Sequence, residues 1–117
     1  MKGAKDMNED LIKAVESLKE SMEQSIQTSK VLDIMVRRFL TEKEIEEVAK
    51  LREIQQENMQ RLVDIAAYIT SGNSDKLQED PKLDLIMIEM DASCTIIDNT
   101  ESSIVSIYEA ARQRVLS

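Results

Sequence analysis

The feature that most constrains the fold is a run of apolar residues spaced three and four apart between residues 80 and 116. This spacing places side chains on one face of an α-helix. Asp80 can cap the free N–H groups at the start of this helix, and Pro81 suits its first position. The main stripe comprises Leu83, Ile86, Met90, Cys94, Ile97, Glu101, Ile104, Tyr108, Ala111 and Val115. A second stripe beside it comprises Leu85, Ile88, Ala92, Ile96, Ser103 and Ile107. Because the combined face is wide enough for two neighbours, we expect this segment to be the central helix of a bundle.

Two earlier segments have the same periodicity, which predicts helices over residues 8–40 and 42–71. The inward residues of the first are Leu11, Val15, Leu18, Met22, Ser25, Ser29, Leu32, Val36 and Phe39. Those of the second are Ile45, Val48, Leu51, Gln55, Asn58 or Met59, Leu62, Ile65, Ala66 and Ile69. Residues 1–7 lack apolar anchors and are expected to form a flexible lead-in. Gly72 can close the second helix in the left-handed conformation, and a polar loop follows it.

The connection near residue 41 decides the topology. Thr41 and Glu44 have the spacing of a capping box, which predicts that a new helix starts there. No Gly or Pro separates the first two helices, so one continuous helix through Leu40 is an alternative, and it would give an elongated dimer. The favoured fold is a single all-α domain over residues 8–117. It is an antiparallel, up-down-up three-helix bundle with long, coiled-coil-like helices that can dimerise into a larger bundle.

Composition excludes several classes of function. The 117 residues fit one domain, and a net charge of −8 repels nucleic acid and anionic membrane surfaces. No apolar run is long enough to span a bilayer, and the polar start lacks a signal sequence, so we expect a cytoplasmic protein. With no His, two glycines and one cysteine, the sequence offers no catalytic group, metal site or cofactor site, and it does not predict an enzyme. Cys94 is expected to be a small buried hydrophobe.

Polar residues occupy inward positions halfway along the three predicted helices. Ser25, Gln55 and Glu101 lie near the helix midpoints, and Ser29 and Asn58 can complete the layer. One interpretation is a structural network that fixes helix register, and in that case Glu101→Leu is expected to raise the melting temperature. The other is a small cavity that binds a polar ligand, which would make the protein a regulatory or sensory bundle.

Apolar residues off the main stripes predict contact with a protein partner. Ile12, Ile34, Ile54, Met87 and Val105 are expected to form an exposed apolar strip. Such strips are usually covered by a partner helix or by a second copy of the chain. The sequence therefore predicts a homodimer or hetero-complex formed by helix–helix packing. The favoured function is a non-enzymatic interaction module, such as a small acidic adapter or chaperone that holds an amphipathic helix.

Overall fold

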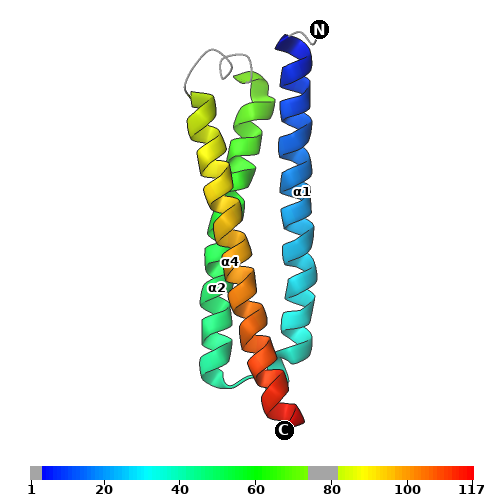
Figure 1. Cartoon of the computed structure of the whole chain (residues 1–117), viewed down its shortest axis with the longest axis vertical. Coiled ribbons are helices and arrows are strands. Elements are labelled where there is room, and N and C mark those ends of the chain that lie inside the picture. The colour runs from blue at the N-terminus through cyan, green and yellow to red at the C-terminus, as the bar shows by residue number, and fades with distance from the viewer. Residues whose placement is uncertain (1–3, 74–81) are drawn as a thin grey trace.

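The computed structural model describes residues 4–73 and 82–117 and forms a rod 61 Å long (Figure 1). Its elements are the helix α1 (Ala4–Val36), a 3₁₀ turn η1 (Arg37–Phe39), the helix α2 (Glu42–Tyr68), a π-helical turn η2 (Ile69–Asn73) and the helix α4 (Lys82–Leu116). α1 descends in Figure 1, α2 returns beside it, and α4 descends again. The prediction of an all-α three-helix bundle is confirmed.

α2 is the central helix of the bundle, and the expectation that the segment 80–116 holds this position is wrong. α2 packs extensively against α4 and also against α1, whereas α1 and α4 have few close backbone approaches. The inward face of α2 is confirmed; its buried residues are Val48, Gln55, Asn58, Leu62, Ile65 and Ala66. In α4 the main stripe is buried at Met90, Ile97 and Ile104, but Leu85 and Ile88 of the second stripe are exposed. The second stripe lacks a neighbour because α1 packs mainly on α2.

The inward face of α1 departs from the expected one in its second half. After Met22 the next buried side chain is Ile26, four residues on, and Ser25 is exposed. Asp33 likewise turns inward, and Leu32 is left 46% exposed. A helix of 3.6 residues per turn can continue a stripe with a step of three or four, and here the four-residue step buries the larger apolar side chain. As a result, Asp33 faces α2 and Leu32 faces the space between α1 and α4.

The first two helices are separate, so the alternative of one continuous helix is wrong. Leu40 and Thr41 have extended backbone conformations, with ψ angles of 148° and 163°. The predicted capping box is present: the Glu44 N–H donates to Thr41 Oγ1 at 3.2 Å, and the Thr41 N–H donates to Glu44 Oε1 at 2.9 Å. Arg114 also donates to Glu44 Oε1 at 2.7 Å and to the Phe39 carbonyl at 2.9 Å. The hydrogen bonds from Arg114 and from the Thr41 backbone lower the pKa of Glu44 to about 2. These contacts tie the end of α4 to the α1–α2 connection.

Thr41→Ala is expected to lower the free energy of unfolding by about 1 kcal/mol, because the first turn of α2 loses its side-chain acceptor. Urea denaturation followed by circular dichroism measures this loss. Thr95→Ala is the matched control, since Thr95 is exposed within α4 and its replacement should change stability by less than about 0.5 kcal/mol. Equal effects of the two substitutions would show that the capping box contributes nothing specific.

The helix ends differ from the expected bounds. α1 begins at Ala4, four residues earlier than expected, and ends at Val36 before the 3₁₀ turn. Gly72 lies inside the π-helical turn η2 instead of closing α2 at that position. The expected loop and the Asp80 and Pro81 start of the third helix fall at residues 74–81, outside the described part of the chain. Within the described residues, no helix has an apolar stretch long enough to cross a membrane.

Candidate functional site: a polar network and an adjacent apolar groove

Six polar side chains are joined by hydrogen bonds between the helices, toward the end of the rod at which α1 and α2 connect, and we call them the polar network. Two come from each helix: Ser29 and Asp33 from α1, Arg52 and Gln55 from α2, and Glu101 and Tyr108 from α4. The network therefore connects all three helices at one level.

Arg52 lies at the centre of the polar network and uses all five of its N–H donors. Its Nε and Nη2 atoms donate to the two carboxylate oxygens of Asp33, each at 2.7 Å, in the paired geometry that guanidinium and carboxylate groups favour. Nη2 also donates to Ser29 Oγ at 2.6 Å, and Nη1 donates to Gln55 Oε1 at 2.7 Å and Glu101 Oε2 at 2.8 Å. Partial burial alone would lower the pKa of Arg52, but Asp33 and Glu101 raise it overall. Arg52 is a permanent cation that ties α1 and α4 to α2.

Glu101 is the acceptor on the α4 side of the network. Its Oε1 accepts the hydroxyl proton of Ser29, and its Oε2 accepts Gln55 Nε2 at 2.8 Å in addition to Arg52. Burial by itself would raise the pKa of Glu101, but the hydrogen bonds from Ser29 and Gln55 and the nearby guanidinium lower it overall. Glu101 is therefore ionised at neutral pH, with an acceptor role for both of its oxygens.

Tyr108 joins the network to the surface between α1 and α4. Its hydroxyl donates to Asp33 Oδ1, which also accepts from Arg52. Burial and the hydrogen bond to Asp33 raise the pKa of Tyr108 above its ordinary value, so the phenol stays protonated. The Ser29–Glu101 and Tyr108–Asp33 bonds link α1 directly to α4, although the two backbones rarely approach each other.

The predicted polar layer overlaps this network only in part. Ser29, Gln55 and Glu101 do lie together, and Gln55 is fully buried. Ser25 does not belong, because the four-residue step to Ile26 turns it to the surface. Asn58 is buried farther along α2, where its Nδ2 donates to the Ile54 carbonyl at 2.9 Å, and no described contact joins it to the network.

Sequence reasoning missed the two residues that carry most of the network's charge. The inward position of Asp33 could have been predicted from the spacing of residues in α1. Steps of four, three and four continue the inward stripe from Met22 through Ile26 and Ser29 to Asp33. Arg52 had a weaker signal: Val48, Arg52 and Gln55 are also separated by steps of four and three, but Leu51 is the apolar residue at that turn. The inward orientation of Arg52 is held by its hydrogen bonds to Asp33, Ser29, Gln55 and Glu101.

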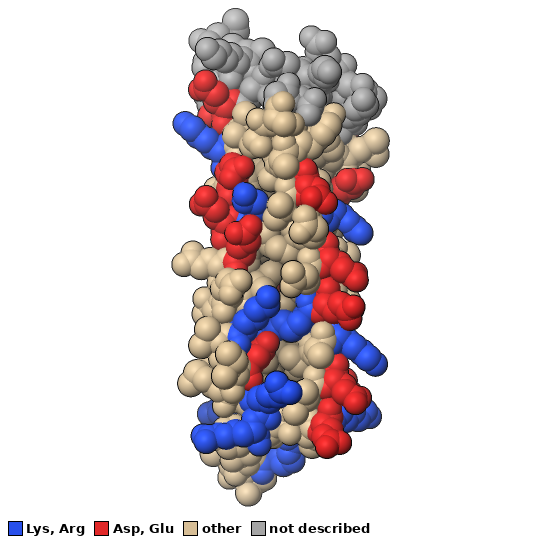
Figure 2. All heavy atoms as spheres, turned by 180° about the vertical axis from the view of Figure 1, so that it is seen from behind, with Lys and Arg blue, Asp and Glu red and all other residues tan. Residues whose placement is uncertain are grey.

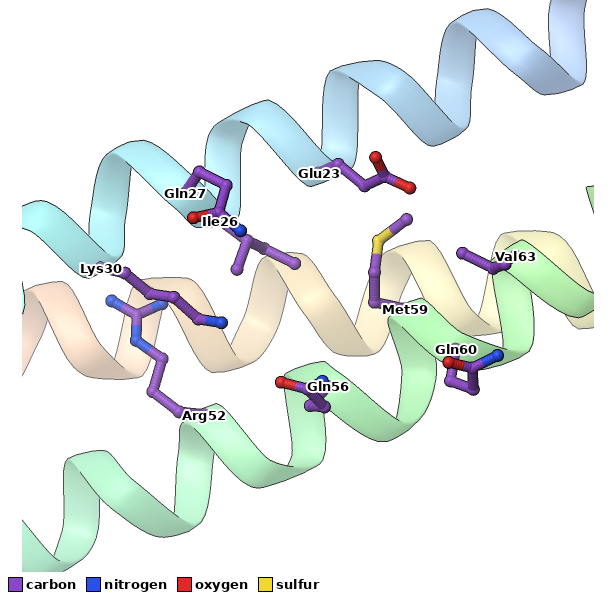
Figure 3. A pocket seen from close by; sticks show the side chains of 9 residues that line it. All are labelled: Glu23, Ile26, Gln27, Lys30, Arg52, Gln56, Met59, Gln60 and Val63. Carbon is purple, nitrogen blue, oxygen red and sulfur yellow. The ribbon is translucent and has the colours of Figure 1, made fainter.

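A small polar pocket opens to solvent beside the network, between α1 and α2 (Figure 3). It encloses about 200 Å³ and is lined by Glu23, Ile26, Gln27, Lys30, Arg52, Gln56, Met59, Gln60 and Val63. Figure 3 shows Lys30 and Arg52 at one end and Met59 projecting between the helices. Because every donor of Arg52 is already used, this pocket offers Lys30 as its available cation.

The residues predicted to form one exposed apolar strip are dispersed over the molecule. Ile12 is only partly exposed and packs against the core, and Ile54 lies on α2. Met87 and Val105 are exposed, but they are 18 residues apart on α4, which is about 27 Å along a helix. Ile34 is 80% exposed near the end of α1. The structure therefore does not bring these five residues together in one strip, and whether any of them contacts a partner stays a prediction.

An apolar groove instead lies between α1 and α4 at the end where α1 and α2 connect. It encloses about 410 Å³. Its apolar lining consists of Leu32, Val36, Phe39, Val105, Ala111, Val115 and Leu116 with the ring of Tyr108, and Glu109 and Arg112 lie along it. The Arg38 guanidinium lies 4.6 Å from the centre of the Phe39 ring. Val31, Ile34 and Met35, which are 57%, 80% and 64% exposed, lie at the same end of α1 but do not line the groove.

The remaining features give no further site. In residues 4–73 and 82–117, no group of three His, Cys, Asp or Glu side chains is placed to hold a metal ion. Cys94 is partly buried, and burial together with Asp98 and Asp91 raises the pKa of its thiol. Neither a protein-family model, nor a characterised protein, nor a solved structure matches this sequence.

Proposed function

We propose that the protein is a non-enzymatic interaction module that holds an amphipathic helix of a partner protein in the apolar groove between α1 and α4. The observation that carries this proposal is the concentration of exposed apolar side chains at one end of these two helices. Grooves between helices commonly bind an amphipathic helix by its apolar face. Within this proposal the protein acts in the cytoplasm as a small adapter or chaperone.

The energetic argument concerns the cost of leaving these side chains in water. Fully burying one large aliphatic or aromatic side chain is worth about 1.5–3 kcal/mol. Leu32, Phe39, Val105, Val115 and Leu116 line the groove and are each at least 39% exposed. A helix laid between them would recover part of this free energy at several positions at once. Large contiguous apolar patches of this kind are typical of interaction surfaces.

The alternative of a small polar ligand bound within the mid-bundle layer has less support. A ligand needs donors or acceptors that the protein does not use itself. All five donors of Arg52 are engaged, and both oxygens of Glu101 accept hydrogen bonds. Because these groups are already hydrogen-bonded within the protein, we infer that the polar network has a structural role and holds α1 against α2 and α4.

Leu32→Glu/Val105→Glu is expected to abolish stoichiometric capture of the partner on the immobilised protein from a lysate of its source. Two carboxylates in the groove would have to be desolvated by any helix that docks there. Ile88→Glu is the matched control, since Ile88 is 65% exposed on α4 outside the groove. Circular dichroism establishes that each variant is folded. Capture that survives in the double variant but fails in the control would place the interaction elsewhere and contradict the proposal.

A further inference from the structure

We infer that the groove selects a helix with an apolar stripe of about three turns flanked by acidic residues. This inference rests on the proposed function and adds the chemistry of the partner. The length follows from the lining: Val105 to Leu116 covers about 16 Å along α4, or three helical turns.

The charge preference follows from an uneven distribution of charge along the rod. Residues 30–44 and 105–117, which surround the groove, hold six of the 15 basic residues and only four of the 23 acidic ones. These two segments together have a net charge of +2, and the rest of the chain has a net charge of −10. Figure 2 shows the rod from behind, with acidic and basic side chains mixed over its upper part, and with basic side chains gathered at the lower left beside acidic ones at the lower right. The apolar groove of this acidic protein is therefore bordered by two chain segments that carry a small net positive charge.

Two basic side chains lie directly beside the apolar lining. Arg38 stacks on Phe39 and has no carboxylate partner among the described residues. Arg112 lines the groove and forms a 3.5 Å ion pair with Glu109 in which both side chains are exposed. Because exposed pairs of this type contribute little, Arg112 can exchange Glu109 for a partner carboxylate at small cost. Acidic residues on both flanks of a docked helix would meet these two guanidinium groups.

The surface next to the groove, on the side of Leu32, limits the length of the apolar stripe on a docked helix. Leu32 also borders a polar hollow, whose other lining residues are Ser21, Gln24, Ser25, Thr28, Ser29 and Glu101. The space between α1 and α4 therefore changes from apolar to polar near Leu32. A helix that continued along it would need small polar residues beyond its third turn.

The same charges make a second copy of the chain less favourable than a partner helix as the molecule bound in the groove. A two-fold symmetric dimer through the groove would bring Arg38 and Arg112 of one copy near those of the other, and like charges facing each other across an interface are unfavourable. The acidic-flanked helix of a different protein gives complementary charges with the same apolar contact.

The test uses the whole 117-residue chain and two fluorescently labelled helical peptides with the same three-turn Leu/Ile stripe, one flanked by Glu and one by Lys. Fluorescence anisotropy near 0.15 M salt, where the Debye length of about 8 Å limits the effect to charges beside the groove, is expected to show severalfold tighter binding of the Glu peptide. Arg38→Glu/Arg112→Glu should reverse the preference. Lys50→Glu/Arg61→Glu changes the net charge equally at exposed positions of α2 and should leave the Glu peptide preferred.

The other outcomes separate the inference from the proposed function. Equal binding of both peptides, lost in Leu32→Glu/Val105→Glu, would overturn the charge preference and leave the helix-binding groove standing. Binding of neither peptide would overturn both. Reversible dimerisation in sedimentation analysis, abolished by Leu32→Glu/Val105→Glu, would assign the groove to a second copy and overturn the inference.

Discussion

Replacing Arg52 with methionine is expected to lower the free energy of unfolding by about 2–4 kcal/mol. The substitution keeps much of the side-chain volume but leaves Asp33 and Glu101 without the cation that compensates them. The side chains of these carboxylates are 23% and 26% exposed, so water replaces only part of what is lost. Urea denaturation followed by circular dichroism measures the change, and an unaltered m-value would show that the folded state remains compact.

Arg61→Met is the matched control for this prediction. Arg61 lies on α2 and is exposed, so its loss should change stability by less than about 0.5 kcal/mol. Arg52→Lys should fall between the wild type and Arg52→Met, because an ammonium group keeps the charge but cannot pair with Asp33 through two parallel hydrogen bonds. A loss below about 1 kcal/mol in Arg52→Met would contradict the view that the network holds the helices together.

The sequence predicted the helices because the pattern that defines them is local. Steps of three and four identified the buried face of α2 from Val48 to Ile69, and the capping box at Thr41 identified the start of this helix. These features depend on residues within one or two helical turns of one another. The order of packing was not predictable in the same way: α4 has the wider apolar face, yet α2 is the central helix.

The site required information about neighbouring helices. A step of three residues from Met22 would turn Ser25 inward, whereas the observed step of four turns Ile26 inward. With Ile26 inward, Asp33 also faces α2 and reaches Arg52. The groove depends on the same choice, because Leu32 is exposed only when Asp33 takes the inward position. A single ambiguity in α1 therefore explains why the polar layer was predicted in part and the groove was not predicted.

The polar network and the groove are physically coupled through Tyr108. Its ring lines the groove, and its hydroxyl donates to Asp33. Since α1 and α4 make few backbone contacts, this bond and the Ser29–Glu101 bond help to set the separation of the groove walls. The polar network therefore supports the two walls of the groove.

Glu101→Leu is expected to lower the free energy of unfolding by about 1–3 kcal/mol, which reverses the rise in melting temperature expected from the sequence alone. That expectation placed Glu101 in a structural polar layer but included no cation beside it, because Arg52 was not among the predicted inward residues. In the structure its removal leaves Gln55 Nε2 with only a 3.4 Å contact to the Ile97 carbonyl. One Nη1 donor of Arg52 also loses its acceptor. Urea denaturation of this variant measures the sign directly.

A double-mutant cycle with Arg52→Met separates the pair from other effects of the leucine. Once Arg52 is gone, Glu101 is itself an uncompensated carboxylate, and its replacement by an apolar side chain should then stabilise the protein. The double variant should therefore be more stable than the sum of the single losses predicts, by at least about 1 kcal/mol. Additive losses would mean that Arg52 and Glu101 act independently, and that Asp33 alone holds the guanidinium in place.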